Sequence, residues 1–93
     1  MTTARARHIL VDSEELCLDL KQQIDDGADF AALAREHSRC PSGRRGGDLG
    51  EFGPGQMVPE FDRVVFEETV GGAHGPVKTQ FGWHLVEITE RTD

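Results

Sequence analysis

The chain has 93 residues, of which ten are basic and seventeen acidic, and its formal net charge is −7. This length suits one domain with one hydrophobic core, and the negative charge repels phosphate backbones and anionic lipids, so neither nucleic acids nor membranes are expected partners. Because no apolar run approaches the ~18 residues of a membrane span and the first residues lack the apolar segment of a secretory signal, we expect a cytosolic protein.

The first predicted element is a β-strand over residues 4–11, in which side chains alternate between two faces. One face carries Ala4, Ala6, His8 and Leu10, so the imidazole of His8 points with apolar neighbours. A histidine on an apolar face is more often a hydrogen-bonded core residue than a catalytic one. The strand alone therefore leaves both roles open for His8.

Two amphipathic helices are predicted next. In the first, Asp12 and Glu15 resemble a capping box, Gly27 provides the end, and apolar residues recur at four-residue spacing: Leu16, Leu20 and Ile24. In the second, Asp29 is the expected N-cap, and one face carries Phe30, Leu33, Ala34 and His37. This helix is expected to end near Ser38.

The second half of the chain predicts a loop, a short helix and a hairpin. Five glycines or prolines between residues 39 and 50 indicate a loop that leads into a strand at 49–52. Pro59 suits the first position of a helix whose inward residues are Phe61, Val64 and Val65. Strands at 75–79 and 83–90 follow, joined by a tight turn through Gln80, Phe81 and Gly82.

This order of elements lacks the regular strand–helix alternation of a parallel sheet, so it favours an α+β fold with helices over a mostly antiparallel sheet. No linker or internal repeat divides residues 1–93, and a single domain is expected. If the first and last strands pair in the middle of the sheet, His8 and His84 become neighbours.

The two cysteines, Cys17 and Cys40, are expected to be free thiols, because a chain in a reducing compartment rarely keeps a structural disulfide. Cys17 lies in the helical pattern, where a thiol behaves as a small hydrophobic group. Cys40 differs because it precedes Pro41 in a polar connection. Cys40 is therefore the candidate for chemistry.

Several motifs, in this order along the chain, resemble parvulin-type peptidyl-prolyl cis/trans isomerases. They are His8-Ile9-Leu10-Val11, Phe30-Ala31-Ala32-Leu33-Ala34 with Ser38 and Ser42, Gly46-Gly47-Asp48-Leu49-Gly50, Gly55-Gln56-Met57-Val58-Pro59 with Phe61, and Gly75-Pro76-Val77 through Phe81-Gly82-Trp83-His84. The resemblance covers essentially the whole chain. In its length and lack of extra domains, the chain is most similar to the minimal, single-domain bacterial members of the family. It implies an FKBP-like fold with a four-stranded, mostly antiparallel sheet.

The resemblance also implies an active site with two walls. A polar wall near the substrate carbonyl consists of His8, Cys40 and His84, with the imidazoles linked through their ring nitrogens and Thr79 fixing one of them. Opposite lies an apolar pocket for the proline ring, formed by Leu49, Met57, Phe61 and Phe81. The implied partners are proline-containing polypeptides, with no cofactor and no metal ion, and the protein is expected to be a monomer.

Rotation about an X-Pro bond has a barrier of ~18–20 kcal/mol and breaks no bond to a leaving group. The planar amide has more charge separation than the twisted transition state, so transfer into an apolar pocket lowers the barrier. Two alternatives stay open: a non-catalytic module that binds proline peptides, as in a chaperone, and a thiol hydrolase that uses Cys40 and His84.

Substrate choice is narrowed by charge. Phosphate-directed parvulins carry a basic cluster after the first strand, whereas this chain has Asp12-Ser13-Glu14-Glu15 there. We therefore expect an unphosphorylated and uncharged residue before the proline. Arg44 and Arg45 are expected to lie in a solvated loop.

Overall fold

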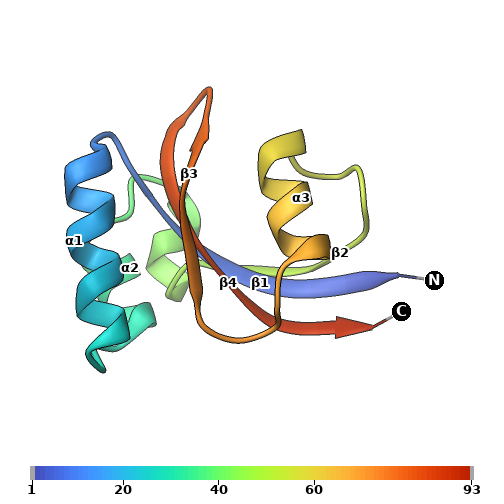
Figure 1. Cartoon of the computed structure of the whole chain (residues 1–93), viewed down its shortest axis with the longest axis horizontal. Helices are drawn as coiled ribbons and strands as arrows, with labels where there is room; N and C mark the ends of the chain where they lie inside the picture. Colours follow the sequence, from blue (N-terminus) through green and yellow to red (C-terminus); the bar gives the residue numbers. More distant parts are fainter. Residues whose placement is uncertain (1, 93) are drawn as a thin grey trace.

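A computed structural model describes residues 2–92, which form a four-stranded sheet with helices on both faces (Figure 1). In chain order the elements are β1 (Thr3–Val11), α1 (Glu14–Asp25), α2 (Phe30–His37), the 3-10 helix η1 (Pro41–Arg45), β2 (Asp48–Phe52), α3 (Pro59–Glu67), β3 (Ala73–Thr79) and β4 (Gly82–Thr92). The predicted α+β class and the antiparallel sheet are confirmed.

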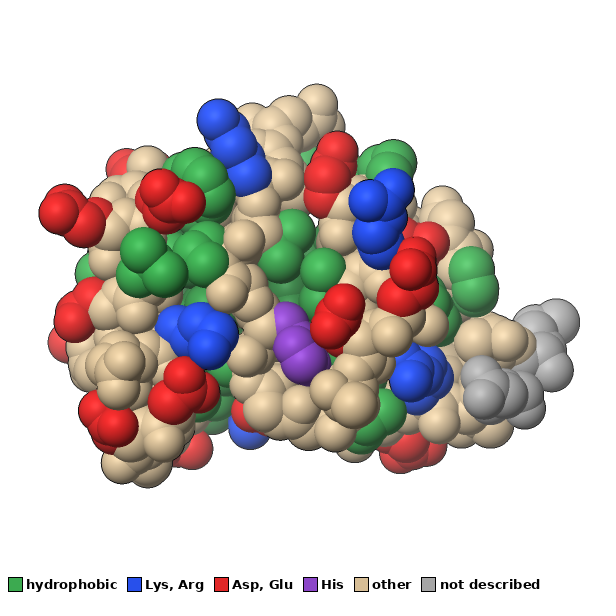
Figure 2. Space-filling view, in the orientation of Figure 1, with side chains coloured by type: hydrophobic (Ala, Val, Ile, Leu, Met, Phe, Trp, Pro, Cys, Tyr) green, Lys and Arg blue, Asp and Glu red, His purple; other side chains and the backbone are tan. Residues whose placement is uncertain are grey.

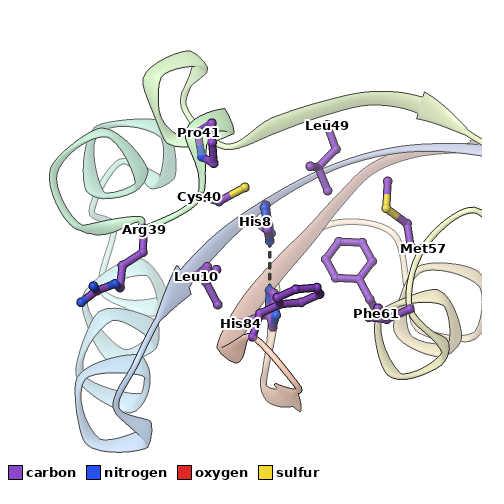
Figure 3. Close-up of a pocket in the computed structure, with 11 residues that line it drawn as sticks. His8, Leu10, Arg39, Cys40, Pro41, Leu49, Met57, Phe61 and His84 are labelled. Carbon is purple, nitrogen blue, oxygen red and sulfur yellow. Dashed lines mark hydrogen bonds between the residues drawn. The ribbon is translucent and has the colours of Figure 1, made fainter.

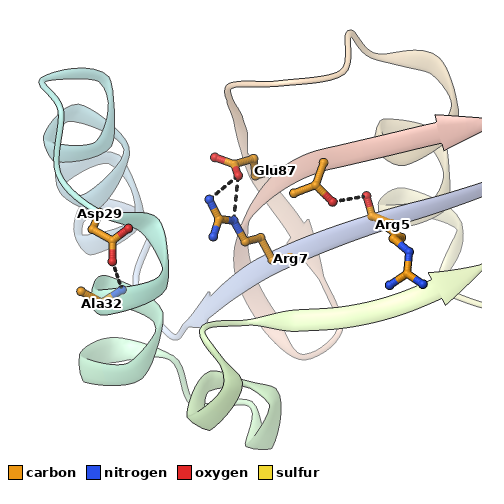
Figure 4. Close-up of polar contacts among 6 residues, drawn as sticks. Arg5, Arg7, Asp29, Ala32 and Glu87 are labelled. Atoms are coloured by element: carbon orange, nitrogen blue, oxygen red, sulfur yellow. Dashed lines mark hydrogen bonds and ion pairs between the residues drawn. The ribbon is translucent and has the colours of Figure 1, made fainter.

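The strand order is β2-β1-β4-β3, and every neighbouring pair is antiparallel. The first and last strands thus pair at the centre of the sheet, which is the condition under which the sequence makes His8 and His84 neighbours. The pairing begins with Thr3 opposite Thr92, so the two ends of the chain leave the sheet side by side (Figure 1). A salt bridge between Arg7 and Glu87, with 2.7 Å from Nε to Oε1, fastens the same pair of strands (Figure 4).

Each face of the sheet has its own cluster of buried apolar side chains. On one face Ile9, Val11 and Leu85 pack against α1 and α2 residues that include Cys17, Leu20, Phe30 and Leu33. On the other, Ala4, Ala6 and Val86 pack with Phe52, Phe61 and Val65. The predicted alternation in β1 therefore separates two packing layers, and His8 belongs to the layer beneath α3.

Cys17 is fully buried, and both cysteines are free within the described residues. Burial, with a smaller contribution from Glu14, raises the pKa of the Cys17 thiol to about 11. This agrees with the predicted role of Cys17 as a small apolar group. The outer side of α1 is solvated, and Figure 2 shows acidic side chains concentrated over this helix. Within residues 2–92, no helix is long and apolar enough to cross a bilayer.

The predicted capping box at Asp12 is wrong, because Ser13 is the N-cap of α1. The Ser13 hydroxyl accepts a hydrogen bond from the backbone N–H of Leu16 at 3.2 Å, whereas the Asp12 carboxylate accepts one from Arg39 at 2.9 Å. The predicted cap of α2 is confirmed, since Asp29 accepts from the backbone N–H of Ala32 at 3.0 Å (Figure 4).

The segment predicted as a plain loop contains the 3-10 helix η1. Pro41, with its fixed φ, lies at the start of this helix, and Gly46 ends it in the left-handed conformation with φ of 71°. The hairpin strands are also longer than expected. β3 begins at Ala73 rather than residue 75, and β4 extends to Thr92 rather than residue 90.

Candidate active site

A cavity of about 370 Å³ opens between β1, the start of η1, β2, α3 and the β3–β4 turn, and its lining is almost entirely apolar (Figure 3). All but one of the predicted site residues line it: His8, Cys40, Leu49, Met57, Phe61, Phe81 and His84. The remaining residue, Thr79, is not among the lining residues but contacts the imidazole of His84. The structure thus brings the predicted polar and apolar groups together around one hollow.

Cys40 reaches this cavity because the chain after α2 is tied to the end of β1. The Ser38 hydroxyl accepts hydrogen bonds from the backbone N–H groups of Leu10 and Cys40, at 3.1 and 3.4 Å. The backbone N–H of Arg39 donates to the Leu10 carbonyl at 2.8 Å. These bonds hold the thiol beside the strand that carries His8.

A second attachment lies at the other end of the same segment. The backbone N–H of His8 donates to the Gly47 carbonyl at 3.0 Å. Gly47 has φ of 84°, and a β-carbon there would overlap the His8 carbonyl oxygen. Gly47 is therefore glycine for two reasons, its left-handed backbone and its close approach to β1. Between the two attachments, η1 is held over the His8 side chain.

The two imidazoles meet through the register of the central strands. His8 lies opposite Val86 and Leu10 lies opposite His84, so the histidines are diagonal neighbours on one face of the sheet. Their rings stack with centroids 5.2 Å apart and an interplanar angle of 15°, and their Nδ1 atoms are 3.0 Å apart. The predicted link through ring nitrogens is confirmed.

Both imidazoles belong to one chain of hydrogen bonds. Ser42 Oγ lies 3.2 Å from His8 Nε2 and donates to Cys40 Sγ at 3.3 Å, while Thr79 Oγ1 lies 2.7 Å from His84 Nε2. The backbone N–H of Phe81 donates to Thr79 Oγ1 at 3.2 Å. Among residues 2–92, every buried side-chain nitrogen and oxygen has a partner.

If the Ser42 hydroxyl donates to the Cys40 sulfur, one assignment of the protons satisfies every hydrogen bond in this series. The Ser42 oxygen then accepts from His8 Nε2–H, and His8 Nδ1 accepts from His84 Nδ1–H. Finally, His84 Nε2 accepts from the Thr79 hydroxyl. In this assignment both imidazoles are neutral, and the Cys40 S–H remains free to donate into the cavity.

Neutral imidazoles agree with the electrostatics of the site. Both side chains are buried, with exposed fractions of 6% for His8 and 4% for His84. Burial, reinforced by repulsion from His84, lowers the pKa of His8 from 6.5 to about 4, and burial also lowers the pKa of His84. A second proton between the facing Nδ1 atoms would leave two N–H groups pointing at each other.

These pKa shifts predict that acid destabilises the fold before most carboxylates titrate. The unfolded chain binds a proton at His8 near pH 6.5 and the folded protein only near pH 4, so stability present above pH 6.5 is lost as the pH falls toward 4. The expected loss is about 1.4 kcal/mol per pH unit from His8, with His84 adding in the same direction. Urea unfolding at pH 7 and pH 5 measures it, and His8→Asn should reduce the difference. Equal stability at the two pH values would contradict a neutral pair.

The apolar wall is built on Phe61, which is 3% exposed. Its ring stands edge-on to both imidazoles, with centroid distances of 5.5 Å to His8 and 5.9 Å to His84. Met57 and Leu49 are partly buried beside it, and Phe81 is 62% exposed at the rim. Figure 3 shows the Met57 and Phe61 side chains at one end of the cavity, with His8 and His84 beside them.

Ser42 belongs to the hydrogen-bonded cluster of the candidate site, and the sequence analysis did not assign it there. It is buried, and it connects the imidazole of His8 to the thiol of Cys40. The available signal was its position two residues after Cys40 in a Pro-Ser-Gly turn. Leu10, Arg39 and Pro41 also line the cavity without having been predicted, and Val58 lines it from the motif of residues 55–59 that carries the family resemblance. Within residues 2–92, no group of three or more His, Cys, Asp or Glu is arranged to hold a metal ion.

Known proteins share this fold and these motifs. The family model described as "Rotamase: PPIC-type PPIASE domain" matches residues 6–90. Foldase protein PrsA of Geobacillus kaustophilus is 46% identical over 88 residues, which cover 94% of this chain and 31% of that protein. The crystal structure of the peptidylprolyl isomerase PrsA from Bacillus anthracis has a TM-score of 0.95 and 35% identity, covering 99% of this chain and 43% of that one.

Shorter relatives match over nearly their full length. The structure of Pin from the archaeon Cenarcheaum symbiosum is 35% identical with a TM-score of 0.85, and the match covers 95% of this chain and 92% of that one. The chain belongs to the parvulin family of PPIC-type peptidyl-prolyl isomerase domains. It spans about a third of the length of the PrsA proteins that it matches.

Proposed function

We propose that this domain catalyses cis/trans rotation about X-Pro peptide bonds in polypeptides and so assists protein folding. The observation that carries this proposal is the apolar cavity formed by Met57 and Phe61 directly beside the hydrogen-bonded His8–His84 pair. The names of similar proteins, foldase for PrsA and peptidylprolyl isomerase for the solved Bacillus structure, support it.

The mechanism we propose is non-covalent. The proline ring enters the space between Met57, Phe61 and Leu49, and the amide loses water as it enters. The twisted transition state has less charge separation than the planar amide, so desolvation lowers the barrier, and a hydrogen bond from the Cys40 S–H orients the carbonyl in the cavity. About 4 kcal/mol of differential stabilisation accounts for a thousandfold acceleration.

The hydrogen-bond geometry does not favour a thiol hydrolase. Among the described residues, the hydrogen-bond partner of the Cys40 sulfur is the Ser42 hydroxyl, and His8 reaches the thiol only through it. An activated thiol needs a base in direct contact, and that base needs an orienting group. His84 is instead turned toward His8 and Thr79.

Replacing Cys40 by aspartate tests this point. We expect Cys40→Asp to keep kcat/KM within about tenfold of the parent, because a carboxyl group can keep the polar wall and accept from Ser42. Exchange NMR on a prolyl tetrapeptide measures the rate. An inactive variant, together with an acyl-enzyme trapped on the parent and seen by mass spectrometry, would establish covalent catalysis instead.

The function itself is tested by the same NMR assay on capped tetrapeptides of the form Ala-X-Pro-Phe, with X varied. We expect saturable acceleration that is greatest for uncharged X. A slow rate with measurable chemical-shift changes on binding would support the other candidate, a module that binds proline segments without turnover. The name "Chaperone SurA" of another relative makes this the relevant alternative.

We further propose that the residue before the proline is unphosphorylated. Asp12, Glu14 and Glu15 follow β1, where a phosphate-directed member would carry basic side chains. In matched peptides, we expect Ser-Pro to be turned over at least as fast as phosphoserine-Pro. A clear preference for the phosphorylated peptide would overturn this. The monomeric state and the cytosolic location also stay predictions, as do the expected lack of a cofactor and a metal ion.

A further inference from the structure

A second cavity, of about 710 Å³, adjoins the proline pocket and shares Arg39, Cys40 and Pro41 with it. We call it the arginine groove, because its walls include Arg35, Arg39, Arg44 and Arg45. These are four of the ten basic residues in the chain, and no acidic residue is among those that line the groove. The groove therefore concentrates positive charge in one region of a protein whose net charge is −7.

Three separate segments supply these side chains. Arg35 lies in the last turn of α2, Arg39 joins α2 to η1, and Arg44 and Arg45 end η1. The attachments of residues 38–47 to β1 hold the segments together, so the groove is built by the same bonds that place Cys40. The groove thus has a fixed position relative to the catalytic cavity.

Among the described residues, three of the four guanidinium groups of the groove have no carboxylate partner. Arg39 pairs with Asp12 at 2.9 Å, and both side chains are largely exposed. Across residues 2–92, no carboxylate lies within 4.0 Å of the guanidinium groups of Arg35, Arg44 or Arg45, although the chain has seventeen acidic residues. The arrangement leaves several planar donors available to an external anion.

The groove adjoins one end of the proline pocket. Figure 3 shows Arg39, Cys40 and Pro41 at the end of the pocket that lies away from Met57 and Phe61. A peptide whose proline lies between Met57 and Phe61 enters the groove if it extends past Cys40. An extended chain advances about 3.3 Å per residue, so the residues that reach the groove are not adjacent to the proline.

We propose that the arginine groove binds the carboxylate side chain of a substrate residue two to four positions from the proline. The domain is thereby selective for acidic proline-containing segments. This inference rests on the proposed function and adds to it the class of substrate. A carboxylate forms bidentate hydrogen bonds with guanidinium groups, and the Asp12 carboxylate on Arg39 can be exchanged for that of the substrate.

The test uses capped, otherwise neutral peptides with one Glu, Gln or Lys at each of four positions on either side of Ala-Pro. At low ionic strength, we expect Glu at one position, two to four residues from the proline, to give about three- to tenfold higher kcat/KM than Gln, and Lys a lower value. The ratio should approach one in ~0.5 M salt, because exposed charges are then screened.

Variants assign the effect to the groove. Arg44→Gln/Arg45→Gln should bring the Glu-to-Gln ratio close to one, and Arg44→Glu/Arg45→Glu should shift the preference to Lys. The matched control is Lys21→Gln/Arg63→Gln, which removes the same charge from α1 and α3 and should leave the ratio unchanged. Equal values for Glu and Gln at every position, or a ratio that survives the groove variants, would overturn the proposal.

The two proposals fail in different ways. If the Gln peptides are not isomerised, the proposed function fails, and the Glu-to-Gln ratio of dissociation constants from chemical-shift titration still tests the groove. If the Gln peptides are isomerised but Glu brings no gain, only the groove proposal fails. A phosphoserine at the favoured position that is preferred more than tenfold over Glu would overturn the assignment to carboxylates.

Discussion

Replacing Phe61 by alanine is expected to lower kcat/KM for a prolyl tetrapeptide by about 10- to 100-fold. Full burial of a ring of this size is worth about 1.5–3 kcal/mol, and each 1.4 kcal/mol lost from transition-state binding is a factor of ten. The Phe61 ring also packs in T-shaped contacts against the imidazoles of His8 and His84. Its loss therefore loosens the polar wall of the cavity as well as the apolar wall. Exchange NMR at saturating and limiting peptide separates KM from kcat, and we expect the larger change in KM.

The Phe61→Ala variant also loses stability, because Phe61 packs with Phe52 and Val65 in the buried cluster between α3 and the sheet. A buried Phe→Ala change costs about 3–5 kcal/mol, so activity must be measured where the protein is still folded. Phe66→Ala is the matched control, since Phe66 packs against Phe52 from the same helix but does not line the cavity. If both variants lose activity equally, the loss reports on stability and Phe61 is not part of the proline pocket.

Replacing Gly47 by alanine is expected to destabilise the protein by at least about 3 kcal/mol. An L-residue at positive φ costs about 1–2 kcal/mol, and here the added methyl group would also overlap the His8 carbonyl. Relief of the overlap requires the chain to leave β1, which removes the hydrogen bond from His8 to Gly47. Urea unfolding measures the loss, and His8 side-chain NMR signals report on the damaged site.

The variant Gly50→Ala separates the cost of the positive φ from the cost of the overlap with the His8 carbonyl. Gly50 has a similar φ of 74°, but a β-carbon there would meet nothing within 4 Å. We therefore expect only the conformational cost of about 1–2 kcal/mol for this control. If the two variants lost the same stability, the close approach of residue 47 to β1 would have no energetic importance.

The sequence predicts the histidine pair well because strand alternation is a local rule. It places His8 on the face of Ala4 and Ala6, and the pairing of the first and last strands then brings His84 beside it. The link through Thr79 and the pocket of Met57 and Phe61 came from the family resemblance, and the structure places these groups as expected.

Features that depend on loop conformation were not predictable in the same way. The Gly and Pro content of residues 39–50 indicates turns but not that η1 places Ser42 between His8 and Cys40. Arg44 and Arg45 are exposed, as predicted, but their position beside Arg35 depends on the docking of α2 on η1, which the sequence does not indicate. At the start of α1, Ser13 rather than Asp12 caps the helix, since tertiary pairing with Arg39 engages the Asp12 carboxylate.

The pairing of Thr3 with Thr92 has a consequence for protein engineering. A polypeptide that enters this module at β1 leaves it at almost the same point, after β4 (Figure 1). Neighbouring ends allow a folded unit to be grafted into a surface loop of a host protein, or its own ends to be joined by a short peptide and reopened elsewhere. The β3–β4 turn borders the cavity, so a new opening is better placed between α1 and α2, on the far side of the sheet.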